Sequence, residues 1–397
     1  IKKTLFSILL LLLCSCVFYS QSELSNELIW QTGEFYPNTI SGIESMNDGE
    51  NYTSIDRFEN AIEINQYSYK NNKKIKTIFS SKKFEDFSFN DYSFSEDENF
   101  ILLSTNVESI YRHSSKGNYY IYDVKENTLS KLTDFSLGKQ RLAKFSPDGT
   151  KIAFVRNNNL FYVILESMKE FQVTIDGEIN NIINGATDWV YEEEFSFHKG
   201  FYWSPDSKKI AYYKFDESNV KEYQMEMYGT LYPTHYKFKY PKAGESNSII
   251  SINVYNILQE RTIPFDIGLN PDIYIPRIKW GKDNDNLYVV KLNRLQNQLE
   301  ILAGNFSNTT PNSQGISTKV IYEEKSDTYI DVHDNMEFIS DEEFIWTSEK
   351  NGFNHIYIIN YIKQTENQLT SGKWEVTSVY GLNNKTNQLY FQAAKNH

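Results

Sequence analysis

The chain has 397 residues, of which 15% are aromatic and 23% charged, and its formal net charge is −12. An acidic balance of this size argues against a nucleic-acid partner, because proteins that bind nucleic acids need a basic surface to contact the phosphates. Frequent Tyr, Phe, Ile and Val with only 18 Gly and 9 Pro favour strands, so we expect an all-β protein.

The first 22 residues have the pattern of a secretory leader. Lys2 and Lys3 precede an apolar run from Leu5 to Val17, which suits a signal peptide but is shorter than the ~20 residues of a membrane span. We therefore predict a signal peptide over residues 1–22 and an exported protein, located in the bacterial periplasm, in the cell envelope or outside the cell. In an alternative interpretation Cys16 is lipidated, which would be the protein's one link to a membrane.

A short pattern recurs along the body of the chain. It consists of an aromatic or aliphatic residue, a turn of the Ser-Pro-Asp type and an apolar strand. Pro fixes φ in such a turn, and Gly tolerates a positive φ. The copies begin at Phe94, Phe145, Trp203, Trp280 and Ile339. Their spacing of roughly 50 to 80 residues is typical of the blades of a β-propeller, each a four-stranded antiparallel sheet.

The repeats lead us to predict one propeller domain over residues 23–397. Counting from Trp30 gives about seven blades, the last of them cut short at His397. The longest interval between repeats contains Glu217 to Asn247, which is rich in Tyr, Met and Pro. We interpret this segment as an excursion from the fourth blade.

Three consecutive carboxylates, Glu192, Glu193 and Glu194, follow a run of large apolar residues. An acidic run alone usually marks a solvated surface. Here Trp189 to Tyr191 precede the acids and Phe195 follows them, so we expect the acids at the rim of a packed region. Adjacent positions on a helical turn point about 100° apart, so two of these carboxylates could hold one ammonium between them.

The neighbours of the acidic pair have structural interpretations. Asp188 has the position of a helix N-cap. For Glu192 we predict a local cap or pairing and no contact with substrate, and His113 is expected to be structural.

Several motifs resemble the dipeptidyl peptidase IV family, in the prolyl oligopeptidase group of serine peptidases. The strongest runs from Gly185 to Phe195 as Gly-Ala-Thr-Asp-Trp-Val-Tyr-Glu-Glu-Glu-Phe and is followed by Tyr-Trp-Ser-Pro-Asp at 202–206. Tyr-Arg-His-Ser at 111–114, Tyr-Pro-Lys-Ala-Gly at 240–244 and Trp-Thr-Ser-Glu-Lys-Asn-Gly at 346–352 agree with it. The resemblance extends from about residue 90 to the end.

The resemblance implies an eight-bladed propeller that covers a C-terminal α/β-hydrolase domain, which carries the catalytic Ser, Asp and His and would lie beyond His397. It further implies that Glu193 and Glu194 bind the ammonium of the substrate's amino end. By the same alignment, Arg112 contacts a backbone carbonyl of the substrate. A guanidinium suits that role because it offers several donors in a rigid fork.

The chain itself shows no catalytic motif. It contains no G-x-S-x-G nucleophile elbow, and its six His are scattered without a metal-ligand spacing. We therefore predict no catalytic residue, metal site or cofactor within the chain.

These observations favour the substrate-selecting propeller of an exported serine exopeptidase. The resemblance implies release of amino-terminal dipeptides whose second residue is Pro or Ala. The expected partners are peptides with a free amino end, the hydrolase domain and a second copy of the chain, for which Glu217 to Asn247 is the candidate contact. Two alternatives remain open: a tripeptidyl peptidase relative, and a non-catalytic propeller that binds peptides or envelope proteins.

Overall fold

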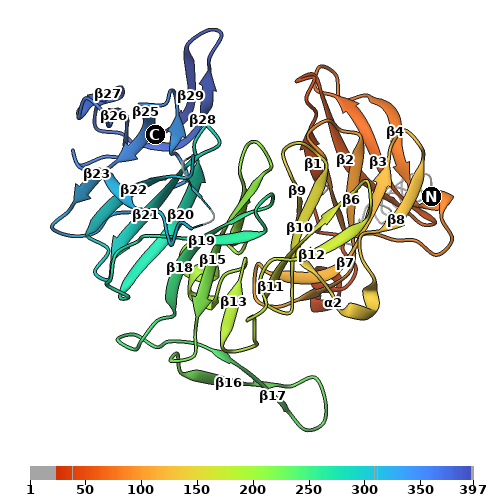
Figure 1. Cartoon of the computed structure of the whole chain (residues 1–397). Coiled ribbons are helices and arrows are strands. Elements are labelled where there is room, and N and C mark those ends of the chain that lie inside the picture. Colours follow the sequence, from red (N-terminus) through yellow and green to blue (C-terminus); the bar gives the residue numbers. More distant parts are fainter. Residues whose placement is uncertain (1–23, 38, 308, 311, 395–397) are drawn as a thin grey trace, which may run out of the picture.

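The computed structural model describes residues 24–37, 39–307, 309–310 and 312–394. These residues form antiparallel sheets that follow one another around an arc in chain order (Figure 1). The predicted leader at residues 1–22, with Cys16, lies outside the described residues. Within the described ranges, no helix is both long and apolar enough to cross a membrane.

The first three sheets each contain four strands that pair in chain order. The first sheet consists of β1 (Ser41–Ser45), β2 (Asn51–Phe58), β3 (Ala61–Ser68) and β4 (Lys74–Ser80). The second consists of β5 (Asp91–Phe94), β6 (Phe100–Ser109), β7 (Ser115–Asp123) and β8 (Thr128–Lys131). The third consists of β9 (Arg141–Phe145), β10 (Lys151–Arg156), β11 (Asn159–Ile164) and β12 (Lys169–Gln172). Short helices accompany them, namely α2 (Asn26–Trp30), η1 (Ser81–Lys83) and η2 (Phe135–Leu137).

The fourth sheet differs because the chain leaves it twice. Its strands are β13 (Ile182–Asn184), β14 (Phe201–Trp203), β15 (Lys209–Asp216), β18 (Ile249–Asn256) and β19 (Arg261–Phe265). The helix α3 (Trp189–Glu194) lies between β13 and β14 in sequence. A hairpin of β16 (Glu222–Met227) and β17 (Thr234–Lys239) lies between β15 and β18.

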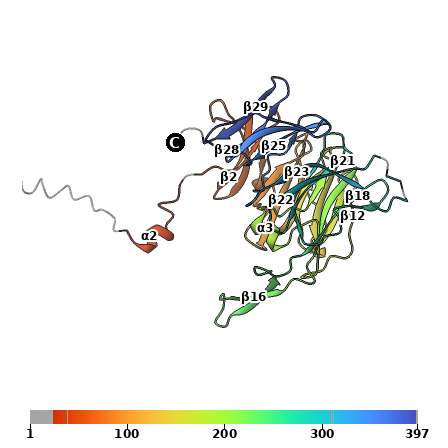
Figure 2. The ribbon, with the colours of Figure 1, turned by 90° about the vertical axis from the view of Figure 1, so that its left-hand side faces the viewer.

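The hairpin confirms the predicted excursion. Strand β15 pairs with β18 along its whole length, from Lys209 opposite Asn256 to Asp216 opposite Ile249, so the blade is complete without the inserted residues. Figures 1 and 2 show β16 and β17 projecting away from the other sheets.

The remaining sheets return to the regular order. The fifth consists of β20 (Ile273–Trp280), β21 (Asn286–Asn293), β22 (Gln298–Asn305) and β23 (Thr318–Lys325). The sixth consists of β24 (Glu337–Phe338), β25 (Glu343–Ser348), β26 (His355–Asn360) and β27 (Thr365–Gln368). The last described strands, β28 (Val376–Asn383) and β29 (Gln388–Ala393), pair with each other.

This topology confirms the predicted propeller of about seven blades. The described residues form six sheets of four or five strands and the final pair β28–β29 in the ring. The starting point of the count was wrong, however. Trp30 belongs to no blade, since it is the exposed last residue of α2.

The repeated turn has one hydrogen-bonding scheme in three blades. In the third blade the Ser146 hydroxyl donates to Asp148 at 2.5 Å and accepts from the backbone N–H of Lys151 at 3.0 Å. Ser95 and Ser204 repeat both bonds in the second and fourth blades. In each of these blades the turn connects two paired antiparallel strands, and the serine hydroxyl pairs the backbone N–H at its end.

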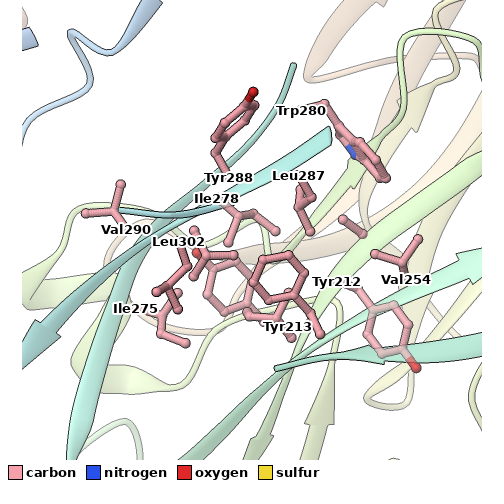
Figure 3. Close-up of a cluster of buried hydrophobic side chains, with 14 of the residues drawn as sticks. Tyr212, Tyr213, Val254, Ile275, Ile278, Trp280, Leu287, Tyr288, Val290 and Leu302 are labelled. Atoms are coloured by element: carbon pink, nitrogen blue, oxygen red, sulfur yellow. The ribbon is translucent and has the colours of Figure 1, made fainter. Parts of the chain in front are cut away.

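The largest apolar core extends from the third sheet to the sixth. In Figure 3, Tyr213 of β15 and Val254 of β18 lie with Ile275 of β20 and Leu287 of β21. Neighbouring residues Tyr212 and Tyr213 are both buried. Burial of consecutive residues requires apolar contacts on both faces of the sheet, as blade-on-blade packing provides. This packing fixes the base from which α3 extends.

Candidate functional site

The helix α3, labelled in Figure 2, begins at a buried aspartate. The Asp188 carboxylate accepts a hydrogen bond from the backbone N–H of Tyr191 at 3.0 Å, which confirms the predicted N-cap. Its second oxygen accepts from the Ser248 hydroxyl at 2.6 Å. Burial raises the pKa of Asp188, and the hydrogen bond from Ser248 opposes that shift. The start of the helix is thereby tied to the segment that leads into β18.

Tyr191 attaches the same helix to the fifth blade. Its ring is buried against the rings of Phe195, Phe197 and Phe215. Its hydroxyl accepts a hydrogen bond from the backbone N–H of Ile275 in β20 at 2.7 Å. A helix of six residues is too short to be stable alone, so contacts of this kind decide where it lies.

Glu192 attaches α3 to the second blade. Its side chain is 0% exposed, and one carboxylate oxygen accepts from the backbone N–H groups of His113 and Ser114, each at 2.8 Å. The prediction of a local cap or pairing is therefore wrong, since both partners lie in the connection between β6 and β7. The reason is burial: an ionised carboxylate removed from water needs donors, and the nearest lie across the blade boundary. His113 contributes its backbone, in keeping with the structural role predicted for it.

Two of the three predicted binding residues lie in contact. The Nε atom of Arg112 is 3.1 Å and 3.3 Å from the two carboxylate oxygens of Glu193. The Arg112 side chain is 73% exposed and that of Glu193 is 17% exposed. Arg112 immediately precedes His113 and Ser114, whose N–H groups bind Glu192. The buried contact of Glu192 therefore also brings Arg112 to Glu193. The Nη atoms of Arg112 have no acceptor in the described part of the chain.

Glu194, the third predicted residue, is exposed and has no hydrogen bond or ion pair within the described residues. Its charge acts on Tyr329, in the connection between β23 and β24. Burial raises the pKa of the Tyr329 phenol, and the carboxylates of Asp331 and Glu194 raise it further. Tyr329 also lines a polar cavity of about 810 Å³. Sequence reasoning missed Tyr329, because no motif connects it to the acidic helix.

A second arginine lies close to the acidic helix. Arg141 is 9% exposed. Within the described residues its Nε and Nη2 atoms have no hydrogen-bond partner, nor does the second oxygen of Glu192. Burial lowers the pKa of the Arg141 guanidinium, and the charge of Glu192 opposes that shift. The chain reaches this position through a bulge in β9, where Leu142 has a positive φ of 65°. Sequence reasoning missed Arg141 as well.

The charges of this site leave one negative charge uncompensated. Three carboxylates, those of Glu192 to Glu194, face the two guanidiniums of Arg112 and Arg141. Among the residues that the structure describes, no hydrogen bond or ion pair reaches the carboxylate of Glu194, which is also the exposed one of the three. In the described residues no group of three His, Cys, Asp or Glu side chains is arranged to hold a metal ion. The arrangement suits a single organic cation with an adjacent hydrogen-bond acceptor.

Comparisons with known proteins identify what the chain is similar to. A family model described as the dipeptidyl peptidase IV N-terminal region matches residues 95–397. Probable dipeptidyl peptidase 4 of Arthroderma benhamiae is 31% identical over 322 residues, which are 77% of this chain and 40% of that protein. Dipeptidyl peptidase 4 of Trichophyton rubrum gives the same values. The chain thus spans about 40% of the length of these curated relatives.

Solved structures agree with the sequence matches. The crystal structure of Porphyromonas gingivalis dipeptidyl peptidase 4 has a TM-score of 0.83 and 39% identity, over 91% of this chain and 51% of that one. A putative dipeptidyl aminopeptidase IV from Bacteroides ovatus has a TM-score of 0.68 at 21% identity, covering 90% of this chain and 50% of its own, and supports the fold alone.

We predict that Glu192 stabilises the fold through its hydrogen bonds. Glu192→Ala leaves the backbone N–H groups of His113 and Ser114 without an acceptor and should lower the free energy of unfolding by about 3 kcal/mol. Glu192→Gln keeps an acceptor oxygen and should cost about half as much. Chemical denaturation measures both changes, with Glu194→Ala as the exposed control. Equal stability of the Glu192→Ala variant and the wild type would contradict this account.

A further prediction concerns pH. Glu217 is buried beside Asp188 at the base of the hairpin, and its burial is the main cause that raises its pKa to about 7, from an ordinary 4.5. Because the pKa of Glu217 is higher in the folded chain than in the unfolded one, its contribution to stability is fully present below pH 4.5. This contribution is lost as the pH rises to about 7. Between pH 5 and 8 the wild type should therefore lose up to about 3 kcal/mol relative to Glu217→Gln. Melting curves across this range test the difference, and the exposed Glu59→Gln should follow the wild type.

Proposed function

This chain belongs to the dipeptidyl peptidase IV family, and we propose that it is the substrate-selecting propeller of a serine peptidase that releases dipeptides from the amino ends of peptides. The observation that carries the proposal is the contact between Arg112 and Glu193, together with the exposed carboxylate of the next residue, Glu194, which has no ion pair within the described residues. An exposed carboxylate and a guanidinium with Nη donors unused in that part of the chain, both in contact with or adjacent in sequence to Glu193, support this proposal.

In this proposal the two charged groups hold different parts of the peptide. Glu194 and Glu193 bind the α-ammonium, which is protonated at neutral pH because its unperturbed pKa is about 7.7 to 8.0. The Nη groups of Arg112 donate to the first backbone carbonyl. Each carboxylate near 4 Å contributes on the order of 4 kcal/mol at an effective dielectric of 20, before the cost of desolvation.

Fixing the amino end determines which bond is cleaved. An extended chain advances about 3.3 to 3.6 Å per residue, so the second peptide bond lies roughly 7 Å from the ammonium. A nucleophile at that distance releases dipeptides. A tripeptidyl enzyme would need its nucleophile about one residue further away, which is the distinction between the two forms.

The chemistry of cleavage would belong to an α/β-hydrolase domain outside residues 1–397. The greater length of the curated relatives supports such a domain, as does the family of this chain. A preference for Pro or Ala as the second residue would be set in that domain. We propose in addition that the protein is exported, by the leader predicted at residues 1–22, with Cys16 as the alternative lipid anchor.

The proposal predicts that only peptides with a free amino end are substrates. With the hydrolase domain present, acetylation of the amino end should abolish cleavage, because it removes the positive charge. Glu193→Ala and Glu194→Ala should each weaken kcat/KM by about 2 to 4 kcal/mol. Product analysis by mass spectrometry identifies the released fragment, and Glu59→Ala serves as the surface control. Comparable cleavage of free and acetylated peptides would refute the proposal, and release of tripeptides would favour the tripeptidyl form.

We propose that the hairpin β16–β17 forms a contact between two copies of the chain. Its tip carries exposed apolar residues, among them Tyr228, Tyr232 and Leu231, which is 93% exposed. The two strands pair only with each other, so each also presents a free edge to a second copy.

The oligomeric state in solution tests this contact. The double change Leu231→Asp and Tyr232→Asp should convert a dimer to a monomer in sedimentation analysis, because it places charge in an apolar contact. Leu269→Asp, at a fully exposed position in another turn, should leave the dimer intact. A wild-type monomer at all concentrations, or a dimer that survives the double change, would exclude the hairpin as the contact.

A further inference from the structure

Arg277 lies on β20 of the fifth blade, but its guanidinium contacts three groups outside that blade. Its Nη1 atom donates to the backbone oxygen of Phe195 at 2.9 Å. Its Nε and Nη2 atoms donate to the two carboxylate oxygens of Asp334, the latter at 3.0 Å. The guanidinium also lies over the ring of Phe197, 5.3 Å from its centroid.

The contact with Phe195 is made at the end of α3 that carries the free carboxylate. Phe195 is the C-cap of the helix and follows Glu194 directly. The last carbonyl groups of a helix have no partner within it and carry a partial negative charge, so a guanidinium is a favourable donor there. Asp188, Tyr191 and Glu192 fix the earlier part of α3. Arg277 holds the end of the helix, at the residue that follows Glu194.

Asp334 determines the net charge that the Arg277 contact brings to the acidic helix. An unpaired guanidinium beside the acidic helix would repel an ammonium bound there. The two-pronged ion pair with Asp334 makes the unit neutral, so Arg277 can orient the helix without competing for its charge. Asp334 also lies in the connection between β23 and β24 that contains Tyr329. Arg277 thereby links the end of α3 to the connection that contains Tyr329.

We propose that Arg277 is a positioning residue for the amino-end site, where with Asp334 it holds the end of α3 so that Glu194 faces a bound ammonium. This inference rests on the proposed function, since it assumes that Glu194 binds the ammonium. Arg277 itself does not contact the peptide. Its two consequences, a fixed helix end and a neutral support, can be measured separately.

The first experiment needs no ligand. In the full chain, Arg277→Met should raise the amide hydrogen-exchange rate of Phe195 and Phe197 at least 10-fold, because both N–H groups bond to Tyr191 at the helix end. Arg156→Met is the matched control. Arg156 makes a two-pronged ion pair with Glu170 in the third blade and does not touch α3. Unchanged exchange in Arg277→Met, or an equal increase in the control, would overturn the positioning role.

The second experiment measures binding of the peptide Ala-Pro-Ala to the full chain by NMR titration. Arg277→Met should weaken binding about 10-fold, and Arg277→Lys should restore part of the loss, because a lysine can still donate to the Phe195 carbonyl. Asp334→Asn leaves the guanidinium charge uncompensated. Its loss of affinity should therefore be large at 20 mM salt and small at 500 mM. Arg277→Met instead leaves the Asp334 carboxylate uncompensated, which attracts the ammonium at low salt, so its loss of affinity should be larger at 500 mM than at 20 mM.

The outcomes separate this inference from the proposed function. If the wild type binds the free peptide but not its acetylated form, and Arg277→Met binds equally well, the positioning role is wrong and the proposed function stands. If the wild type does not distinguish the two peptides, the proposed function fails, and the exchange experiment alone decides whether Arg277 holds the helix end.

Discussion

The buried carboxylate of Glu192 is the contact on which the candidate site depends. It crosses from the fourth blade to the second and binds two backbone N–H groups of the β6–β7 connection. A buried charge is tolerated only when donors compensate for lost hydration, so this geometry is strongly specified. Glu193 follows Glu192 in sequence, and Arg112 precedes its partner His113. The contact of Glu192 thereby also brings Glu193 and Arg112 together.

The rest of the site follows from how a short helix is held. Asp188 and Tyr191 tie α3 to the segment before β18 and to β20, and Arg277 holds its end. Packing of apolar residues between blades provides the rigid base for these contacts. A propeller supplies such a base because each sheet is buried on both faces, while the connections at its ends remain available for binding.

Charge pairing then decides which group is available. Arg112 pairs with Glu193, Arg141 lies buried near Glu192, and Asp334 neutralises Arg277. Glu194 is left as the exposed carboxylate without an ion pair in the described residues. A site with three acidic residues thus presents one net negative charge, which matches one ammonium.

The sequence by itself determined the features that arise from neighbouring residues. The Ser-Pro-Asp turns, the Asp188 cap, the excursion before β18 and the acidic triplet each depend on chemistry within a few positions, and so they were predictable. That Arg112 belongs to the same site as the triplet was inferred only through resemblance to a family, and its ion pair with Glu193 was not predicted.

Tertiary structure alone decided the long-range contacts. Glu192 was expected to pair locally but binds residues nearly 80 positions away, and Arg141, Arg277 and Tyr329 carried no signal in the sequence. The physical reason is that burial and partner choice depend on which blades are adjacent in space. The residues on either side of an Asp, Glu or Arg in the sequence do not tell whether its side chain is solvated or buried between two sheets. Only the fold removes the water from it.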